Sequence, residues 1–158
     1  MKSNWLSLAL YKPQIPQNTG NIGRTCVGLN TPLHIIGKPA FFLDDKEVKR
    51  AGLDYWKDLK LVQHAHFEEF FTHIDPKQCY FFSKNGHKNL FEVSFKKGDC
   101  LIFGQETHGL PQDICSQFAS QTIFLPMGEK IRSYNLSNAV AIAAFEAYRQ
   151  IFTSHNKK

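Results

Sequence analysis

Three stretches of the chain carry the residue types from which ligand-binding loops are built. They span residues 16–24, 101–111 and 123–138, and each combines glycine or small polar residues with the edge of an apolar run. Glycine lets a ligand approach the backbone, whose N–H and C=O groups can then bind it directly. The first stretch also holds Arg24, whose planar fork matches a phosphate group. Together they predict loops that bind a polar or anionic ligand.

The first stretch, Pro16–Arg24, follows an apolar run and leads into a helical pattern. Backbone N–H groups at a helix start favour anions, and we expect Gly20 and Gly23 to allow a close approach. The spacing matches neither a P-loop nor a dinucleotide-binding motif. The alternative interpretation is a turn, a cap and a solvated arginine.

The second stretch is an apolar run that ends in a loop with Gly104 and Gly109. Ligands of open α/β sheets bind beyond the carboxyl ends of the strands, so this loop is well placed for a site. Glu106 could accept a hydrogen bond from a ligand or orient a neighbouring chain. The alternative is a tight strand-to-helix turn with a surface acid.

The third stretch places four serine and asparagine residues, at positions 133, 135, 137 and 138, before an apolar helical segment. Two of them could cap that helix. The others could bind a ligand or fix the loop.

Metal and nucleophile chemistry find little support. His64 and His66 would share one face of a strand, but no third ligand is apparent. No nucleophile elbow is present, and no cysteine neighbours a histidine. No two of the four cysteines have C-x-x-C spacing, and Cys79 and Cys100 fit a buried core. We therefore expect no metal and a reduced, cytoplasmic setting.

The elements that must position these loops alternate along the chain. Short apolar runs predict strands at 6–11, 33–36, 60–62, 80–82, 101–103 and 122–125. Helical patterns cover a segment from Asn18 or Asn21 toward Leu29, then 45–51, 67–73, 112–119 and 136–151. The strands are apolar throughout, as in a parallel sheet covered on both faces. We expect one α/β domain over residues 1–158.

Composition limits the partners. A net charge of +5 and a pI near 9.0 permit binding to nucleic acid without requiring it. The stretch at 1–10 is too short and polar for a signal peptide or membrane span, so no membrane partner is expected. The last helical segment is apolar around most of its circumference, which predicts a second subunit against it.

Taken together, the three stretches resemble the three motifs of the SPOUT-class, SpoU-like RNA 2′-O-methyltransferases. The resemblance spans nearly the whole chain and is closest to the small tRNA (cytidine/uridine) wobble 2′-O-methyltransferases. The segments Ile15–Asn21, Asp44–Lys46 and Ala51–Trp56 also favour that subfamily. The sequence departs from the family at His108, where arginine is common, at Gly23, where an aliphatic residue is frequent, and at Tyr134, where a smaller or aliphatic residue is common. Lys84 and Asn85 also vary a stretch that is usually small and polar.

This resemblance implies a mostly parallel α/β sheet with helices on both faces, a C-terminal trefoil knot, a homodimer, and a tRNA substrate modified at its wobble ribose. It implies S-adenosyl-L-methionine as cofactor, with Arg24 as the catalytic residue near the 2′-proton. Because arginine is a poor base, we expect Arg24 to clamp the target phosphate and leave the general base unassigned. The implied cofactor-binding residues are Phe82, Ser83, Gly104, Glu106, Gly109, Leu125, Met127, Ser133, Leu136 and Asn138. Candidate RNA-backbone contacts are Lys46, Lys49, Arg50, Lys84, Lys88, Lys130 and Arg132. Methylation of another RNA, such as rRNA, and a non-catalytic RNA-binding module are the alternatives.

Overall fold

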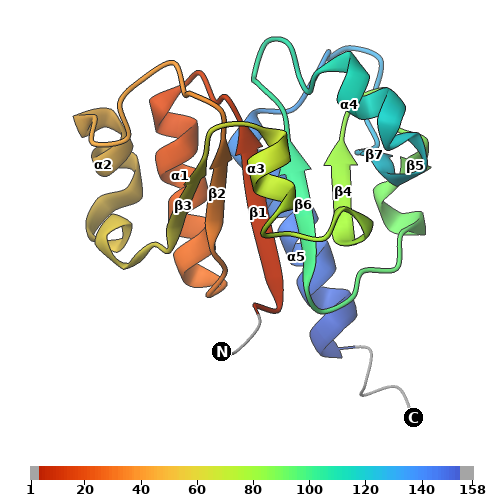
Figure 1. Ribbon diagram of the computed structural model, residues 1–158, viewed down its shortest axis with the longest axis horizontal. Coiled ribbons are helices and arrows are strands. Elements are labelled where there is room, and N and C mark those ends of the chain that lie inside the picture. Colours follow the sequence, from red (N-terminus) through yellow and green to blue (C-terminus); the bar gives the residue numbers. More distant parts are fainter. Residues whose placement is uncertain (1–3, 154–158) are drawn as a thin grey trace.

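Seven parallel strands form one sheet in the computed structural model, which describes residues 4–153 (Figure 1). The strand order is β3-β2-β1-β6-β4-β7-β5. The strands are β1 (Leu6–Tyr11), β2 (Leu33–Ile36), β3 (Leu61–His64), β4 (Cys79–Phe82), β5 (Lys88–Asn89), β6 (Asp99–Phe103) and β7 (Thr122–Phe124). The helices are α1 (Pro16–Gly28), α2 (Lys46–Gly52), α3 (Phe67–Phe71), α4 (Gln112–Gln117) and α5 (Leu136–Thr153). Four 3-10 turns join them, namely η1 (Leu53–Asp58), η2 (Pro76–Gln78), η3 (Leu90–Glu92) and η4 (Ala119–Gln121).

The six predicted strands and five predicted helices are confirmed, with shifted ends. The prediction that α1 begins at Asn18 or Asn21 was wrong, because Pro16 occupies its first turn and Ile15 precedes it without a side-chain cap. Proline suits that position since the N–H that it lacks has no partner in the helix. The two-residue strand β5 was not predicted.

Two helical layers cover the sheet. Successive residues of a strand face opposite sides, so Leu8 and Leu10 of β1 pack with α1 and α5, whereas Ala9 packs with α3 and α4. Figure 1 shows α3 in front of the sheet and α5 behind it. Cys79 and Cys100 are fully buried in the second layer, as predicted.

The glycines of α1 are packing residues. A Cβ atom on Gly20 would lie 2.4 Å from the Val48 carbonyl oxygen, and one on Gly23 would lie 2.6 Å from the Trp56 ring. Both glycines therefore let α2 and η1 approach the helix closely. The expectation that they admit a ligand was wrong, because the space beside them holds the protein itself. The same contact explains why this chain has Gly23 where the family often has an aliphatic residue, since the Trp56 ring fills the space of an aliphatic side chain.

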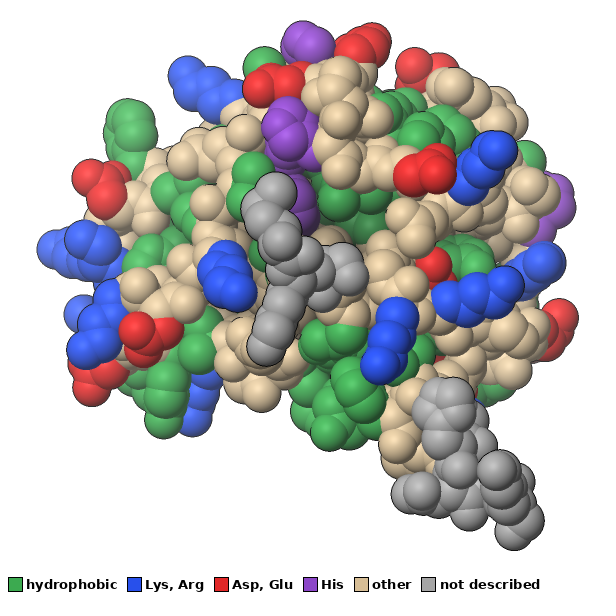
Figure 2. Space-filling model, turned by 60° about the horizontal axis from the view of Figure 1, so that its bottom comes forward, with side chains coloured by type: hydrophobic (Ala, Val, Ile, Leu, Met, Phe, Trp, Pro, Cys, Tyr) green, Lys and Arg blue, Asp and Glu red, His purple; other side chains and the backbone are tan. Residues whose placement is uncertain are grey.

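The outer face of α5 carries exposed apolar side chains. Ile142, Phe145, Tyr148 and Phe152 are each between 40% and 55% exposed, while Val140, Ala143, Ala144 and Ala147 are fully buried on the sheet side. Trp5 packs edge-on against Tyr148 and Phe152, with ring centroids 5.6 and 5.1 Å away. Figure 2 shows exposed hydrophobic side chains gathered between the two chain ends. The predicted second apolar face of this helix is thus confirmed.

No helix in the described part of the chain is long and apolar enough to cross a membrane.

Candidate functional site

A pocket of about 850 Å³ lies at the carboxyl ends of β4, β6 and β7. Its floor is formed by Phe82 and Phe103, which are register partners on adjacent strands and stack with ring centroids 4.5 Å apart. Ile123, beside Phe82 in the sheet, extends this apolar surface. Pockets of this size with apolar walls and a few polar groups bind small molecules and cofactors.

The loop after β6 forms one wall of the pocket. The N–H of Gln105 donates to the carbonyl of Gly109 at 3.1 Å, and the N–H of Gly109 returns the bond at 3.0 Å. A Cβ atom on Gly104 would lie 2.1 Å from the backbone carbon of Gly109, so only glycine fits there. Gly109 has φ +66°, which glycine adopts without strain. Both predicted glycines therefore give this wall its shape.

Glu106 ties this loop to the beginning of α1. Its carboxylate accepts from the N–H of Gln14 at 3.0 Å and from that of Ile15 at 2.6 Å. In the reverse direction, the side-chain oxygen of Gln14 accepts from the N–H of Thr107 at 3.0 Å and from the Thr107 hydroxyl at 2.7 Å. The carboxylate lines the pocket while it binds backbone donors of its own chain.

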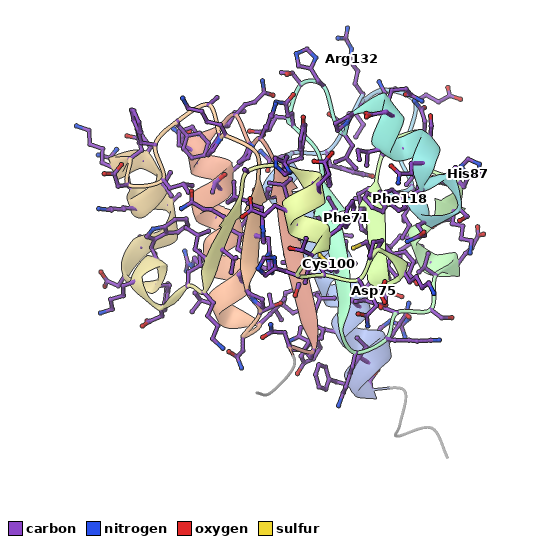
Figure 3. All side chains as sticks on the ribbon, viewed as in Figure 1. Phe71, Asp75, His87, Cys100, Phe118 and Arg132 are labelled. Atoms are coloured by element: carbon purple, nitrogen blue, oxygen red, sulfur yellow. The ribbon has the colours of Figure 1, made fainter. Side chains whose placement is uncertain are left out.

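The loop between β7 and α5 forms the opposite wall. The Tyr134 hydroxyl donates to the Pro126 carbonyl at 2.6 Å and closes the loop on itself. Asn135 caps α5, because its side-chain oxygen accepts from the N–H of Ser137 at 2.9 Å. Figure 3 shows Arg132 on this loop, beyond the sheet end to which the strands point. The departure at Tyr134 thus supplies a bond that holds the wall together.

Asn18 joins α1 to this wall. The Asn135 side-chain amide donates to the Asn18 side-chain oxygen at 3.1 Å, and Asn18 is 5% exposed. Asn18 was expected as a helix cap within the first stretch and was not among the predicted site residues, but it lines the pocket. Nothing in the local pattern distinguishes a capping asparagine from one that lines a site.

Most of the predicted site residues come together here. The pocket is lined by Phe82, Ser83, Gly104, Glu106, Gly109, Leu125, Met127, Ser133 and Leu136. Asn138 is not part of the lining, and its N–H donates to the Asn135 side chain at 3.3 Å. The lining also includes Ile15, Leu110, Cys115 and Ala139, which the sequence did not single out. Burial raises the pKa of the Cys115 thiol, which disfavours its charged, nucleophilic form.

Arg24 does not line the pocket of its own chain. It is six residues after Asn18, which places it about 9 Å further along the helix axis and on another side of the helix. Its guanidinium lies over the Tyr55 ring, 5.6 Å from the centroid, and is exposed. The structure therefore separates Arg24 from the other predicted residues.

A histidine pair is buried away from this pocket, between the sheet and α3. Nδ1 of His34 lies 2.8 Å from Nε2 of His64, and both side chains are less than 7% exposed. The expectation that His64 and His66 share a strand face was wrong, because β3 ends at His64 and His66 caps α3. Residues 4–153 contain no group of three or more His, Cys, Asp or Glu residues that could hold a metal ion.

The chain belongs to the SpoU rRNA Methylase family, whose family model matches residues 6–145. A relative from Escherichia coli, named tRNA (cytidine(34)-2′-O)-methyltransferase, is 42% identical over 92% of this chain and 94% of its own. A relative of the same name from Saccharophagus degradans is 41% identical over 92% of this chain and 95% of its own. A solved structure described as giving insight into the 2-OH methylation of C/U34 on tRNA has a TM-score of 0.86 and 44% identity, covering 93% of this chain and 96% of that one.

Proposed function

We propose that this protein transfers a methyl group from S-adenosyl-L-methionine to the 2′-oxygen of the wobble cytidine or uridine, nucleotide 34, of tRNA. The observation that carries the proposal is the pocket built by three loops at the carboxyl ends of β4, β6 and β7. Two relatives, each more than 40% identical over most of both chains, are named for 2′-O-methylation of cytidine 34 in tRNA.

The pocket fits the proposed cofactor in size and chemistry. Its volume of about 850 Å³ lies in the range that holds a drug-sized ligand. Apolar surfaces of Phe103, Leu125 and Leu136 suit the flat faces of an adenine, and the backbone of the two loops offers partners for its edge. A solved SpoU methyltransferase described as a complex with AdoMet shares the fold, with a TM-score of 0.83 at 23% identity.

When bound, S-adenosyl-L-methionine supplies a methyl group on a sulfonium, which a ribose 2′-oxygen can attack in line. The protein must orient the two reactants and accommodate loss of the 2′-proton. Lys84 and Arg132, both in the pocket lining, are placed to bind the phosphates of an incoming nucleotide. Glu106 keeps the loop in place through the amides of Gln14 and Ile15.

We assign Arg24 to the target phosphate, where its fork would clamp the RNA and help the 2′-hydroxyl ionise. A guanidinium stays protonated in proteins and is therefore a poor base, so the clamp role suits it better. Lysine cannot reproduce a bidentate contact, so Arg24→Lys should be nearly inactive. Turnover near that of the unmodified enzyme would rule this role out.

Arg24 would act in the pocket of a second copy of the chain. It lies on the outer side of the helical layer formed by α1 and α5, away from its own pocket, and the exposed apolar face of α5 belongs to that layer. A homodimer that covers this face would bring Arg24 toward the partner subunit. Such symmetric pairing is the commonest form of assembly.

A mixed-dimer experiment tests this arrangement. Arg24→Ala and Leu125→Glu should each abolish activity alone, and co-expression should restore about one quarter of the unmodified activity. Random pairing makes about half of the dimers mixed, and each mixed dimer keeps one intact site. No recovery in dimers verified as mixed would place Arg24 in its own subunit's site.

We further propose that residues 1–158 act as one domain in the cytoplasm and that the C-terminal part is threaded as a trefoil knot. Contact of Gly86 with the backbone of β7, where a Cβ would lie 2.4 Å from the Ile123 carbonyl carbon, supports tight threading. Pulling the two chain ends apart tests the knot. A knotted chain stops short of the length that 158 residues reach at about 3.3–3.6 Å each.

The deciding experiment is methyl transfer from labelled cofactor to bulk tRNA from cells that lack this protein, with the product nucleotide mapped. Label as 2′-O-methylcytidine or 2′-O-methyluridine at position 34 is expected. Label in rRNA instead would move the target to another RNA. Cofactor binding without transfer to any RNA would leave a non-catalytic binding module.

A further inference from the structure

A second groove, of about 490 Å³, lies at the other end of the sheet from the pocket. Lys77 of η2, Lys88 of β5, and Lys96 and Lys97 of the segment before β6 line it. Four of its ten lining residues are thus lysines, whereas lysine and arginine together make up 19 of the 158 residues of the chain. Figure 2 shows several such side chains on the right of its view.

The groove and the pocket lie along the same face of the sheet. Tyr80 lines the groove and Phe82 the pocket, and residues two apart in a strand point to the same side. Asp99 and Phe103 repeat this relation along β6. Four residue steps at about 3.3 Å make the separation roughly 13 Å.

The positive charge of the groove is only partly balanced. Within the described residues, none of the four lysines has a carboxylate oxygen within 4 Å. Burial raises the pKa of Asp99, which disfavours its negative charge, and one of its oxygens accepts from the N–H of Lys96 at 2.8 Å. Glu92 is the one exposed acid of the lining. The groove therefore presents a cationic surface.

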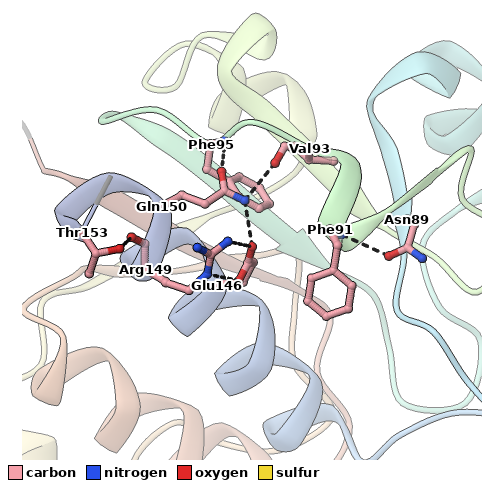
Figure 4. A network of polar contacts seen from close by, with 8 residues as sticks. All are labelled: Asn89, Phe91, Val93, Phe95, Glu146, Arg149, Gln150 and Thr153. Carbon is pink, nitrogen blue, oxygen red and sulfur yellow. Dashed lines mark hydrogen bonds and ion pairs between the residues drawn. The ribbon is translucent and has the colours of Figure 1, made fainter. Parts of the chain in front are cut away.

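The segment that leads to Lys96 and Lys97 is held by α5 (Figure 4). The side chain of Gln150 accepts from the N–H of Phe95 at 2.8 Å and donates to the carbonyl of Val93 at 2.9 Å. Glu146, behind Gln150, forms an ion pair with Arg149 at 2.8 Å, so its negative charge is already matched. These bonds tie one wall of the groove to the last helix.

We propose that this groove is a second docking site for the tRNA substrate and binds phosphates of its stem while the wobble nucleotide presents its 2′-oxygen to the cofactor at the pocket. The inference rests on the proposed function. A site that receives one nucleotide leaves the rest of a large polyanion outside, and a duplex carries roughly one charge per 1.7 Å of axis in DNA. Several phosphates of a similarly dense RNA stem therefore fall within the separation of the two sites.

The test compares two triple variants that remove the same charge. The groove variant loses three positive charges through Lys77→Gln, Lys88→Gln and Lys96→Gln. Lys97 is left intact because it lies over Phe152 on the apolar face of α5. The control variant replaces Lys38, Lys57 and Lys60, which lie near β2 and β3 at the opposite edge of the sheet. Binding of full-length tRNA is measured by anisotropy over a range of salt concentrations. Thermal unfolding and S-adenosyl-L-methionine affinity report whether each variant is folded.

For the groove variant, the plot of the logarithm of the tRNA association constant against the logarithm of salt concentration should be less steep by roughly 2 to 3. Each lost phosphate contact reduces the magnitude of this slope by about 0.7 to 0.9. At 0.1 M salt this slope change corresponds to roughly 100- to 1,000-fold weaker binding. A trinucleotide centred on the wobble nucleotide, too short to span the roughly 13 Å to the groove, should bind both variants equally well. Equal losses in the groove and control variants would overturn the proposal, as would an equal loss with the short oligonucleotide.

These measurements are separate from methyl transfer. If the enzyme binds tRNA through the groove but methylates another nucleotide, the proposed target is wrong and the proposed docking role of the groove still holds. Correct methylation at nucleotide 34 with an unchanged salt slope in the groove variant would contradict the groove alone.

Discussion

Acid should destabilise this protein through its buried histidine pair. His34 and His64 stack with ring centroids 5.1 Å apart and share a hydrogen bond that requires one ring nitrogen without a proton. Phe70 packs edge-on against both rings, and His73 and Glu69 face His64. Burial, followed by the neighbouring histidines, lowers the pKa of His34 to about 4. The pKa of His64 is also lowered, chiefly by burial.

The sign and size of the effect follow from these pKa values. The unfolded chain takes up a proton at His34 near pH 6.5, whereas the folded chain resists protonation until about pH 4. The folded state therefore loses stability as the pH falls from 6.5 toward 4. Between pH 7.5 and pH 5 the loss from His34 is about 2 kcal/mol, and it approaches about 3 kcal/mol below pH 4.

Urea unfolding of the unmodified protein and of His34→Asn, at pH 7.5, 6 and 5, tests this prediction. The asparagine amide lies near the position of Nδ1 and can still bond to His64, but it does not titrate. Titrating groups that do not contact residue 34 contribute alike to both proteins, so their contributions cancel in the comparison. The unmodified protein should lose about 2 kcal/mol more than the variant between pH 7.5 and pH 5. Equal losses would mean that His34 is not kept neutral by the fold.

Two further predictions concern the walls of the pocket. Glu106→Gln should lower the free energy of unfolding by about 1 kcal/mol and Tm by about 3 °C, because the amides of Gln14 and Ile15 lose a charged acceptor. An unchanged calorimetric Tm would show that the carboxylate does not hold the loop. Tyr134→Phe removes the bond to the Pro126 carbonyl and should weaken S-adenosyl-L-methionine binding about fivefold at constant Tm. Equal calorimetric Kd values would exclude this contribution of the hydroxyl to the loop.

The apolar runs predicted the sheet well because a strand covered on both faces must be apolar along its whole length. They could not reveal β5, since Lys88 and Asn89 are polar and only the backbone joins them to β7. The carboxyl-end rule and the family motifs predicted most of the pocket lining. Strand order, and therefore which loops meet, depends on long-range pairing that no local pattern encodes.

The errors at single residues have a common physical cause. A glycine that admits a helix and one that admits a ligand look alike in sequence, and Gly20 proved to be the first kind. An asparagine near the start of a helix can cap it or line a site, and Asn18 lines one. Arg24 belongs to the same motif as Asn18, but the helical turn directs the two side chains differently. Such assignments need the positions of neighbouring elements.

The position of β1 in the middle of the sheet has a consequence for synthesis of the chain. Leu6 pairs with Asp99, so one neighbour of the first strand is made 93 residues after it. At about 5 to 20 residues per second, a ribosome needs roughly 5 to 20 seconds to deliver that partner. During this interval the apolar edge of β1 has only β2 beside it. The nascent chain therefore passes through an incomplete sheet whose unpaired strand edge is prone to aggregation. Chaperone binding at this stage should raise the yield of native protein.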